Sequence, residues 1–307
     1  MIIATGEVLT HKKYGEHFHS LTIVAPRIGE QVEPGQFVNV CCNGDRSFIL
    51  RRPFSVYRVH KRGGWAATIE IVFDIRGPGT KHLAELRSHS NVELLGPCGR
   101  GFQLPSERSH CLLIGGGIGA APLFFLADEL RNEGHRVDVI MGAQSIHRLL
   151  NAIDVRRLAS VSRITTEDGS MGQQGVVTDV IDDMVERCSS DIVYACGPHP
   201  MLAAIAQMCR ERSLPLQVAV EELMACGYGV CMTCVMPVLS GSSRSGTEEP
   251  VYARVCTEGP VFDGARVCWF ESEGRVSVEQ SELSPGGAPA RSGEDESERV
   301  ELAPPGN

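Results

Sequence analysis

The stretch CLLIGGGIGAAPL, residues 111–123, runs from a short apolar segment into a cluster of glycines and then into a helical pattern. A buried strand followed by a glycine loop and a helix is typical of the first unit of an α/β nucleotide-binding fold. The spacing departs from the strict Gly-x-Gly-x-x-Gly motif, so on its own the loop only indicates a dinucleotide site. The candidate residues of this loop are Gly115, Gly116, Gly117 and Gly119.

The sequence that follows alternates between strand-like and helix-like patterns. Helices are expected within 122–134, 148–158, 176–186 and 201–212, and strands within 137–143, 162–168 and 191–197. This alternation predicts a parallel, doubly wound sheet. Cys196 and Gly197 end the last strand, so we expect them near the glycine loop, at the carboxyl edge where ligands bind. Cys196 is either a small buried residue or part of the nicotinamide pocket.

The sequence before residue 105 has a different character. Short strand-like runs lie at 19–25, 35–42, 67–75 and 91–96, separated by turn clusters, and one helix is expected at 79–87. Several short strands at this spacing predict an antiparallel β-barrel.

Two motifs within this region indicate a flavin. The first is Arg52-Pro53-Phe54-Ser55, in which the guanidinium can make paired, charge-assisted hydrogen bonds to a diphosphate and the serine hydroxyl can bond the flavin ring. The second comprises Gly77, Gly79 and Thr80 at a predicted helix start, where free N–H groups favour a pyrophosphate. A surface salt bridge and a simple helix cap are the alternatives, and the presence of both motifs argues against them.

A cysteine cluster dominates the last third of the chain. EELMACGYGVCMTCV, residues 221–235, contains Cys226, Cys231 and Cys234, and Cys256 follows after a hydrophilic loop. Cys-x4-Cys-x2-Cys with a later cysteine is the plant-type [2Fe–2S] spacing, which supplies two thiolates to each iron. Glycines between the ligands let the backbone approach the cluster closely.

The chain contains twelve cysteines, and a cluster is not the only role open to them. A zinc site usually has two short Cys pairs, of which only Cys231 and Cys234 form one, although Cys256 and Cys268 could complete it. Unligated core cysteines are a second alternative. Cys268 lies in the strand-like run ARVCWF, 265–270, and is expected to be buried and not a ligand. Most of the others are expected to be small buried residues.

Composition and charge exclude some classes of function. The net charge of −9 argues against nucleic acid as a main partner, because phosphate backbones are bound by clustered Lys and Arg. The chain has no signal-peptide pattern and no apolar run of about 18 residues, so a cytoplasmic protein is expected. From about residue 277 the sequence is rich in Ser, Glu, Gly and Pro, and disorder is expected there.

Taken in order, these motifs resemble the electron-transfer subunits of type B dihydroorotate dehydrogenase, within the ferredoxin-reductase superfamily. The resemblance covers about Met1 to Val276 and is carried by RRPFS, GGGIG, CGPHPM and the two cysteine segments. It implies an FAD-binding barrel at 1–105, an NAD-binding α/β domain at 106–216 and a small [2Fe–2S] domain at 217–276, before the tail at 277–307.

The resemblance also implies particular site residues. Cys226, Cys231, Cys234 and Cys256 match the cluster ligands, and the flavin motifs match at Arg52, Pro53, Phe54, Ser55, Val72, Phe73, Asp74, Gly79 and Thr80. Asp74 departs from the family, which often has a basic residue there. Arg76 lies two positions on, hence on the same face of a strand, and could substitute.

The implied reaction is an electron relay. Dihydroorotate is oxidised at FMN in a separate catalytic subunit, expected to form a heterotetramer of two subunits of each kind. Electrons then pass through the cluster and FAD of this chain to NAD+. No residue here is expected to act as general acid or base, because the cofactors carry the chemistry. The cluster segment, with Met224 and Tyr228, is the expected docking surface, although local packing of the loop is the simpler explanation for those two.

Alternative functions share this layout. One is a related subunit of an NAD(P)H–ferredoxin oxidoreductase, a sulfide dehydrogenase or a hydrogenase. Another is a zinc-binding interaction module that has lost its flavin. NAD is expected over NADP, because the segment after the second strand of the α/β domain offers only His147 and Arg148 to a 2′-phosphate.

Overall fold

The computed structural model describes residues 1–42, 49–63, 65–240 and 250–269, and Met1–Trp269 form one compact unit. The tail from residue 277, predicted to be disordered, lies outside the described residues. The boundaries proposed at 105 and 216 remain a prediction. None of the helices in the described ranges is long and apolar enough to cross a membrane.

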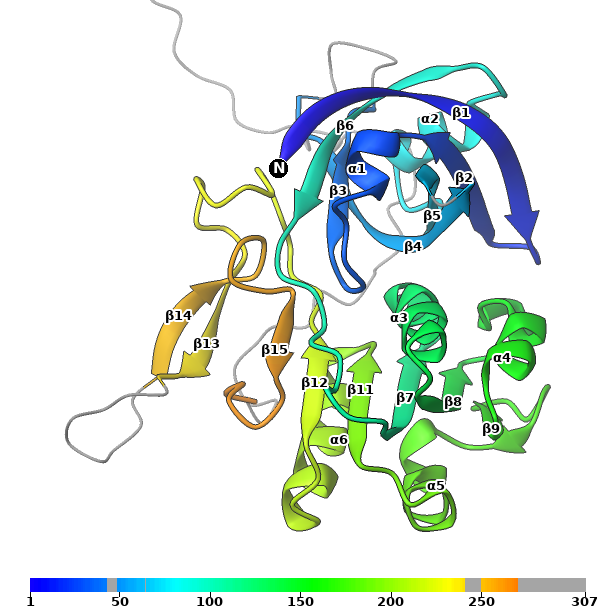
Figure 1. Ribbon diagram of the computed structural model, residues 1–307, viewed down its shortest axis with the longest axis vertical. Helices are drawn as coiled ribbons and strands as arrows, with labels where there is room; N and C mark the ends of the chain where they lie inside the picture. Colours follow the sequence, from blue (N-terminus) through cyan, green and yellow to red (C-terminus); the bar gives the residue numbers. More distant parts are fainter. Residues whose placement is uncertain (43–48, 64, 241–249, 270–307) are drawn as a thin grey trace, which may run out of the picture. The chain divides into compact units, whose positions relative to one another are not determined.

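Six antiparallel strands close into a barrel in the first part of the chain (Figure 1). Their order around the barrel is β1–β2–β5–β4–β3–β6, with bounds Ile2–Tyr14, Phe18–Val24, Trp65–Asp74, Arg52–Arg62, Phe37–Val40 and Asn91–Cys98. Closure leaves no unpaired strand edge around the ring. The predicted antiparallel barrel is confirmed.

Alternate strand positions fill the barrel with apolar side chains. Leu21 and Ile23 of β2 meet Ile69 and Ile71 of β5 in this core, which the short helices α1 (Pro26–Gly29) and α2 (Pro78–Glu85) help to close. Strand β1 was not predicted, because most of its side chains are exposed or half-buried and it has no apolar alternation. Its neighbours β2 and β6 hold it in the barrel through backbone pairing.

The second half of the unit is an open sheet of seven strands in the order β10–β9–β8–β7–β11–β12–β15 (Figure 1). Their bounds are Gln173–Gln174, Ser162–Thr166, Arg136–Ala143, His110–Gly116, Ile192–Cys196, Leu216–Ala219 and Val261–Asp263. All neighbours pair in parallel except β15, which is antiparallel to β12. The chain moves outward from β7 to β9 and then crosses back to β11, so the topological switch point lies between β7 and β11.

The two faces of this sheet are covered by different helices. On β7, Cys111 and Leu113 face α3 (Ala121–Asn132) and α4 (Ala152–Leu158), whereas Leu112 and Ile114 face α5 (Ile181–Cys188) and α6 (His199–Glu211). Burial on both faces explains why β7 reads as a continuous apolar run. The predicted doubly wound sheet is confirmed.

One helix predicted as continuous is interrupted. A short 3-10 turn, Ile146–Arg148, ends at the first residue of the predicted helix 148–158, and α4 begins only at Ala152. Asn151 separates them because it adopts a left-handed conformation, with φ of 44°, and its side chain accepts a hydrogen bond from the Asp154 N–H. An asparagine tolerates this conformation better than most residues.

After β12 the chain forms the cysteine loop, then the hairpin of β13 (Val235–Leu239) and β14 (Pro250–Arg254), and returns as β15. The run 265–270 was predicted as strand-like, but within the described residues only a single bridge, Val238 with Val267, occurs there. Cys268 is half-buried and not fully buried as expected.

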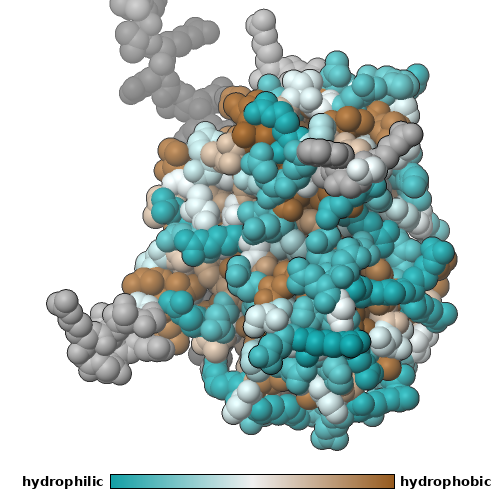
Figure 2. Space-filling view, in the orientation of Figure 1, coloured by the Kyte–Doolittle hydropathy of each residue, from teal (hydrophilic) through white to brown (hydrophobic). Residues whose placement is uncertain are grey.

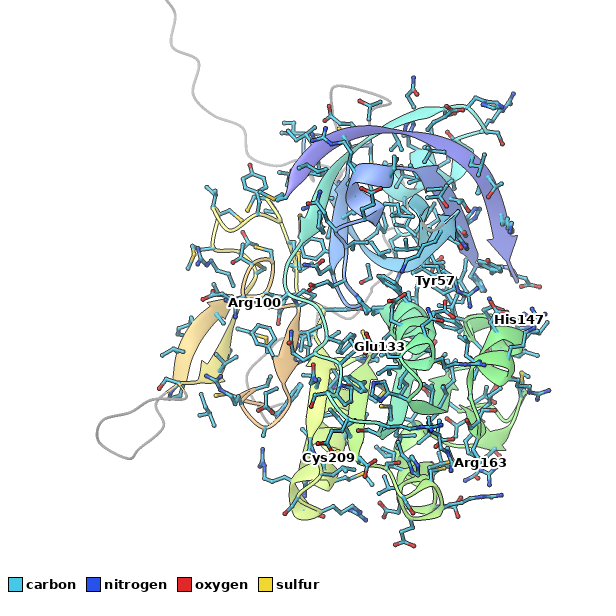
Figure 3. The ribbon with its side chains drawn as sticks, in the orientation of Figure 1. Tyr57, Arg100, Glu133, His147, Arg163 and Cys209 are labelled. Carbon is cyan, nitrogen blue, oxygen red and sulfur yellow. The ribbon has the colours of Figure 1, made fainter. Side chains whose placement is uncertain are left out.

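Helix α3 joins the two halves, because it packs on β4 of the barrel as well as on β7 and β8 of the sheet. Arg58 of β4 forms ion pairs with Asp128 of α3, at 3.3 Å, and Asp154 of α4, at 2.8 Å. Its guanidinium also lies 5.1 Å from the ring centre of Tyr57, a fully buried residue labelled in Figure 3. A charge so enclosed is stabilised only with partners on several sides, which fixes the barrel against the sheet.

Candidate functional site

The flavin motif begins at the first residue of β4. A Cβ atom built on Gly79 would lie 3.4 Å from Arg52 Nε and 3.4 Å from Cys42 Sγ, so the Arg52 side chain lies in van der Waals contact with the start of α2. Arg52 donates to the Leu50 carbonyl at 2.9 Å, which orients its guanidinium. The structure therefore brings the two predicted flavin motifs into contact.

Thr80 caps helix α2. Its hydroxyl accepts hydrogen bonds from the N–H groups of Arg76, at 2.8 Å, and Gly77, at 3.1 Å. The first turn of any helix still presents N–H groups without partners in the helix, and the dipole favours an anion there. Arg52 and the start of α2 thus form a cradle that fits a diphosphate, as FAD requires.

The other flavin residues line the strands beside this cradle. Pro53, Phe54 and Ser55 pair with Asn39, Val38 and Phe37 of β3. The side chains of Val72 and Phe73 are buried, so only their backbones are available to a cofactor.

Asp74 ends β5 and links the barrel to the nucleotide half. Its carboxylate accepts a hydrogen bond from Arg148 Nη1 at 2.6 Å, and Arg76 Nε lies 3.6 Å from it. Arg76 was expected on the same strand face, but β5 ends at Asp74, so it lies in the following loop. Arg148, considered from the sequence for a 2′-phosphate, is instead paired with Asp74.

The two loops predicted for the nicotinamide dinucleotide meet at the switch point. A Cβ atom on Gly119 would lie 2.9 Å from the Cα of Gly197, and one on Gly197 would lie 3.2 Å from the Cα of Gly116. Such approaches need glycines on both loops. Gly115 is equally confined, by Ala120, and Gly117 has a φ of +56°, which favours glycine.

Cys196 lies in the core between these loops and the barrel. It is buried, and burial raises the pKa of its thiol well above the ordinary value. The thiol is therefore neutral and acts as a small apolar group at physiological pH.

Sequence reasoning missed Glu221, which follows β12 at the same edge of the sheet. Its Oε1 would lie 3.1 Å from a Cβ on Gly119, so the carboxylate lies at the glycine loop. Burial raises the pKa of Glu221, against the opposing effects of Arg76 and His199. The signal was an acidic pair, Glu221 and Glu222, directly after a strand that ends at the ligand-binding edge.

The four predicted cluster cysteines come together as two pairs. Cys231 is exposed, and hydrogen bonds with Thr233, with the Cys226 backbone and with the Cys226 thiol lower its pKa to about 6. Cys256 is buried, and burial together with contact with Cys234 raises its pKa to about 12. Pairing of Cys226 with Cys231 and of Cys234 with Cys256 matches a two-iron cluster, which needs two thiolates per iron.

Backbone groups around the loop point to the sulfurs. The N–H groups of Tyr228 and Val230 donate to Cys226 Sγ at 3.5 and 3.4 Å, and the Cys256 N–H donates to Cys234 Sγ at 3.4 Å. Beside Cys256, the buried Thr257 hydroxyl has no hydrogen-bond partner.

These observations fit an iron–sulfur cluster. Donors directed at thiolates and an unsatisfied hydroxyl beside a ligand suit a group that carries acceptor sulfurs. Within the described ranges, no group of three or more His, Cys, Asp or Glu side chains is placed to hold a single metal ion.

The surface around the cysteine loop is apolar. Leu223, Val230 and Met232 are 84%, 73% and 53% exposed, and Tyr228 is 45% exposed. Figure 2 shows apolar atoms at the left edge of the view, where Figure 1 places this loop. Met224, which was expected with Tyr228 at the docking surface, instead packs against the sheet core. Local packing of the loop therefore accounts for this residue.

Residues 221–268 match the family model described as the iron–sulfur cluster binding domain of dihydroorotate dehydrogenase B. The chain is 35% identical over 245 residues to the dihydroorotate dehydrogenase B (NAD(+)) electron transfer subunit of Desulforamulus reducens, covering 80% of this chain and 90% of that protein. It is 36% identical over 264 residues to the subunit of the same name from Geobacillus kaustophilus, covering 85% and 96%.

Solved structures show the same architecture. An NADH-dependent reduced ferredoxin–NADP oxidoreductase, described for flavin-based electron bifurcation, has a TM-score of 0.72 at 26% identity, over 87% of this chain and 90% of that one. A ferredoxin–NADP+ reductase from Neisseria gonorrhoeae with bound FAD and NADP has a TM-score of 0.56 at 17% identity, over 68% and 91%, and shows the fold alone.

Replacement of one cysteine at a time tests the cluster ligands. Cys226→Ser, Cys231→Ser, Cys234→Ser and Cys256→Ser should each lose most of the iron and acid-labile sulfide, because one of the two irons then lacks a thiolate. Cys268→Ser is the matched control and should keep both. The measurement is iron and sulfide per chain after anaerobic purification; full content in the Cys256→Ser protein would contradict the assignment.

Arg52→Ala tests the diphosphate cradle. Loss of a charge-assisted contact costs roughly 1.5–3 kcal/mol, so the FAD dissociation constant should rise about ten- to hundredfold. Arg52→Lys should recover part of the affinity, since it keeps the charge but not the paired geometry. Arg27→Ala, at an exposed arginine of α1, is the control. Equal FAD retention by Arg52→Ala and the control after dilution would assign Arg52 another role.

Proposed function

This chain belongs to the family of dihydroorotate dehydrogenase B electron transfer subunits, and we propose that the three adjoining sites described above carry its electron relay. The protein is an NAD-linked oxidoreductase subunit of pyrimidine biosynthesis that uses FAD and a [2Fe–2S] cluster. The observation that supports the assignment of residues is the meeting of the paired cysteines, the Arg52 cradle and the two glycine loops in one compact unit.

Each set of residues has a distinct task in this proposal. Arg52, Gly79 and Thr80 hold the FAD diphosphate, and the four paired cysteines hold the cluster. Bound FAD would convert single electrons from the cluster into hydride for NAD+. The glycine loops at the switch point seat the dinucleotide, and Glu221 borders that seat.

Oxidation of dihydroorotate takes place on a partner subunit in this proposal. Such a partner carries FMN, and two copies of each chain assemble, as the resemblance implies. The described residues form a six-stranded barrel and an open sheet, and they include no barrel of eight βα units that could hold a second flavin. Cytoplasmic location remains a prediction of the sequence.

The exposed apolar residues around Cys231 are the proposed docking surface. Large apolar side chains on a surface mark interaction sites when they adjoin one another. Tyr228, Val230 and Met232 flank the exposed cysteine on both sides, so a partner that covers them also approaches the cluster.

A related subunit of a ferredoxin-linked oxidoreductase is the second candidate function. The TM-score of 0.72 to the NADH-dependent reduced ferredoxin–NADP oxidoreductase favours it, at 26% identity. The curated relatives at 35–36% identity support the dihydroorotate assignment more directly. Reduction of ferredoxin without any dihydroorotate activity would support this second function.

Reconstitution with a catalytic subunit tests the proposed function. Alone, the chain should oxidise NADH with artificial acceptors and should leave dihydroorotate unchanged; with a type B catalytic subunit, it should reduce NAD+ in a dihydroorotate-dependent reaction. Val230→Asp should weaken that coupled activity about tenfold or more, because it buries an unpaired charge at the contact. Ile153→Asp on α4, equally exposed, is the control. Dihydroorotate oxidation by the isolated chain would refute the proposal that this reaction takes place on a partner subunit.

Nucleotide preference tests the pairing of Arg148 with Asp74. NADH should be used more efficiently than NADPH, because the guanidinium after β8 is already paired. Asp74→Asn releases it and should shift the ratio of kcat/KM values towards NADPH by about tenfold, the effect of one charge-assisted contact. Glu16→Gln, facing His147 of the same loop, is the control. If Asp74→Asn and the control both keep the wild-type ratio of kcat/KM values for NADPH and NADH, Arg148 does not reach the 2′-phosphate of NADPH.

A further inference from the structure

Asn39 is the one polar residue in the strand FVNV of β3, and it is only 1% exposed. A buried amide is costly unless it is hydrogen-bonded, so its partners identify its role. On one side of β3 Asn39 pairs with Pro53 of the flavin motif, and on the other it pairs with Leu95 of β6. It therefore lies one strand away from the predicted flavin contacts.

The side chain of Asn39 reaches the cysteine loop, 188 positions along the chain. Its Nδ2 donates to the Gly227 carbonyl at 3.2 Å and to Cys98 Sγ at 3.5 Å. Gly227 follows the first cluster cysteine and has a φ of +73°. A Cβ atom there would lie 2.4 Å from Asn39 Nδ2, so the approach requires a glycine.

The hydrogen bond from Asn39 falls on the same peptide unit that faces a cluster cysteine. The carbonyl of Gly227 and the N–H of Tyr228 belong to one planar group and point in opposite directions. That N–H donates to Cys226 Sγ at 3.5 Å. By holding the Gly227 carbonyl, Asn39 sets the direction of the Tyr228 N–H. The same hydrogen bond polarises that N–H, because hydrogen bonds in series strengthen one another.

We propose that Asn39 is a positioning residue that tunes the reduction potential of the cluster through the 227–228 peptide. Hydrogen bonds to cluster sulfurs help to set the potential of an iron–sulfur centre, since they stabilise the more negative, reduced form. Asn39 thereby couples the strand beside the flavin motif to the electronic state of the cluster. This inference rests on the proposed function and adds to it a residue that acts through the peptide of the cysteine loop.

The test compares cluster potentials in the full-length protein. Asn39→Leu is close in volume and lacks the donor, and Asn39→Ala is measured beside it in case leucine disturbs the strand. Cys98→Ala is the matched control, because it removes the other contact of the Asn39 amide and leaves the Gly227 hydrogen bond in place. The readouts are the midpoint potential from an anaerobic redox titration and the electron paramagnetic resonance spectrum of the reduced cluster.

Both Asn39 variants should shift the cluster to a more negative potential, with an altered spectrum. The equilibrium for reduction should fall by up to about tenfold, or about 59 mV for one electron. The control should keep the wild-type potential. Unchanged potentials at full cluster content would overturn the inference. Loss of the cluster from both Asn39 variants, with FAD retained, would also overturn it, because Asn39 would then have a purely structural role. A wild-type protein without a cluster would instead refute the proposed function.

Discussion

The antiparallel pairing of β15 with β12 is the constraint on which the arrangement of the sites depends. The chain leaves the sheet at Ala219, forms the cysteine loop and the β13–β14 hairpin, and returns beside the strand that it left. Further hydrogen bonds extend this closure, from the Val220 N–H to the Pro260 carbonyl at 3.0 Å and from the Gly264 N–H to the Leu216 carbonyl at 2.8 Å. The pairing covers the edge of the sheet and anchors a loop that has little apolar core of its own.

A second set of contacts fixes the barrel to the same frame. The Arg100 N–H, in the segment after β6, donates to the Gly259 carbonyl next to β15 (Figure 3). On the other side, Arg58 joins the barrel to α3 and α4. Because these ion pairs are partly buried, they favour one arrangement of β4 against α3 and α4. Electron transfer benefits from such rigidity, since its rate falls steeply with the distance between cofactors.

Hydrogen bonds and close backbone contacts, more than catalytic side chains, shape the functional region. The glycines at 116, 119 and 197 bring two loops together at the switch point, and the Arg52 side chain lies against Gly79 at the start of α2. Two pairs of cysteines receive backbone N–H groups. Such a site positions and tunes cofactors that supply the reactivity.

The sequence by itself determined the elements with strong local signals. The apolar run before the glycines predicted β7 and the parallel sheet, and the cysteine spacing predicted the iron–sulfur domain, because each pattern lies within a short stretch of sequence. Tertiary structure decided the rest. Asn39 with Gly227, and Asp74 with Arg148, are paired across 188 and 74 positions, and neither residue of a pair signals its partner locally. Strand β1 was likewise decided by its neighbours β2 and β6, since long-range pairing has no periodicity that a linear sequence displays.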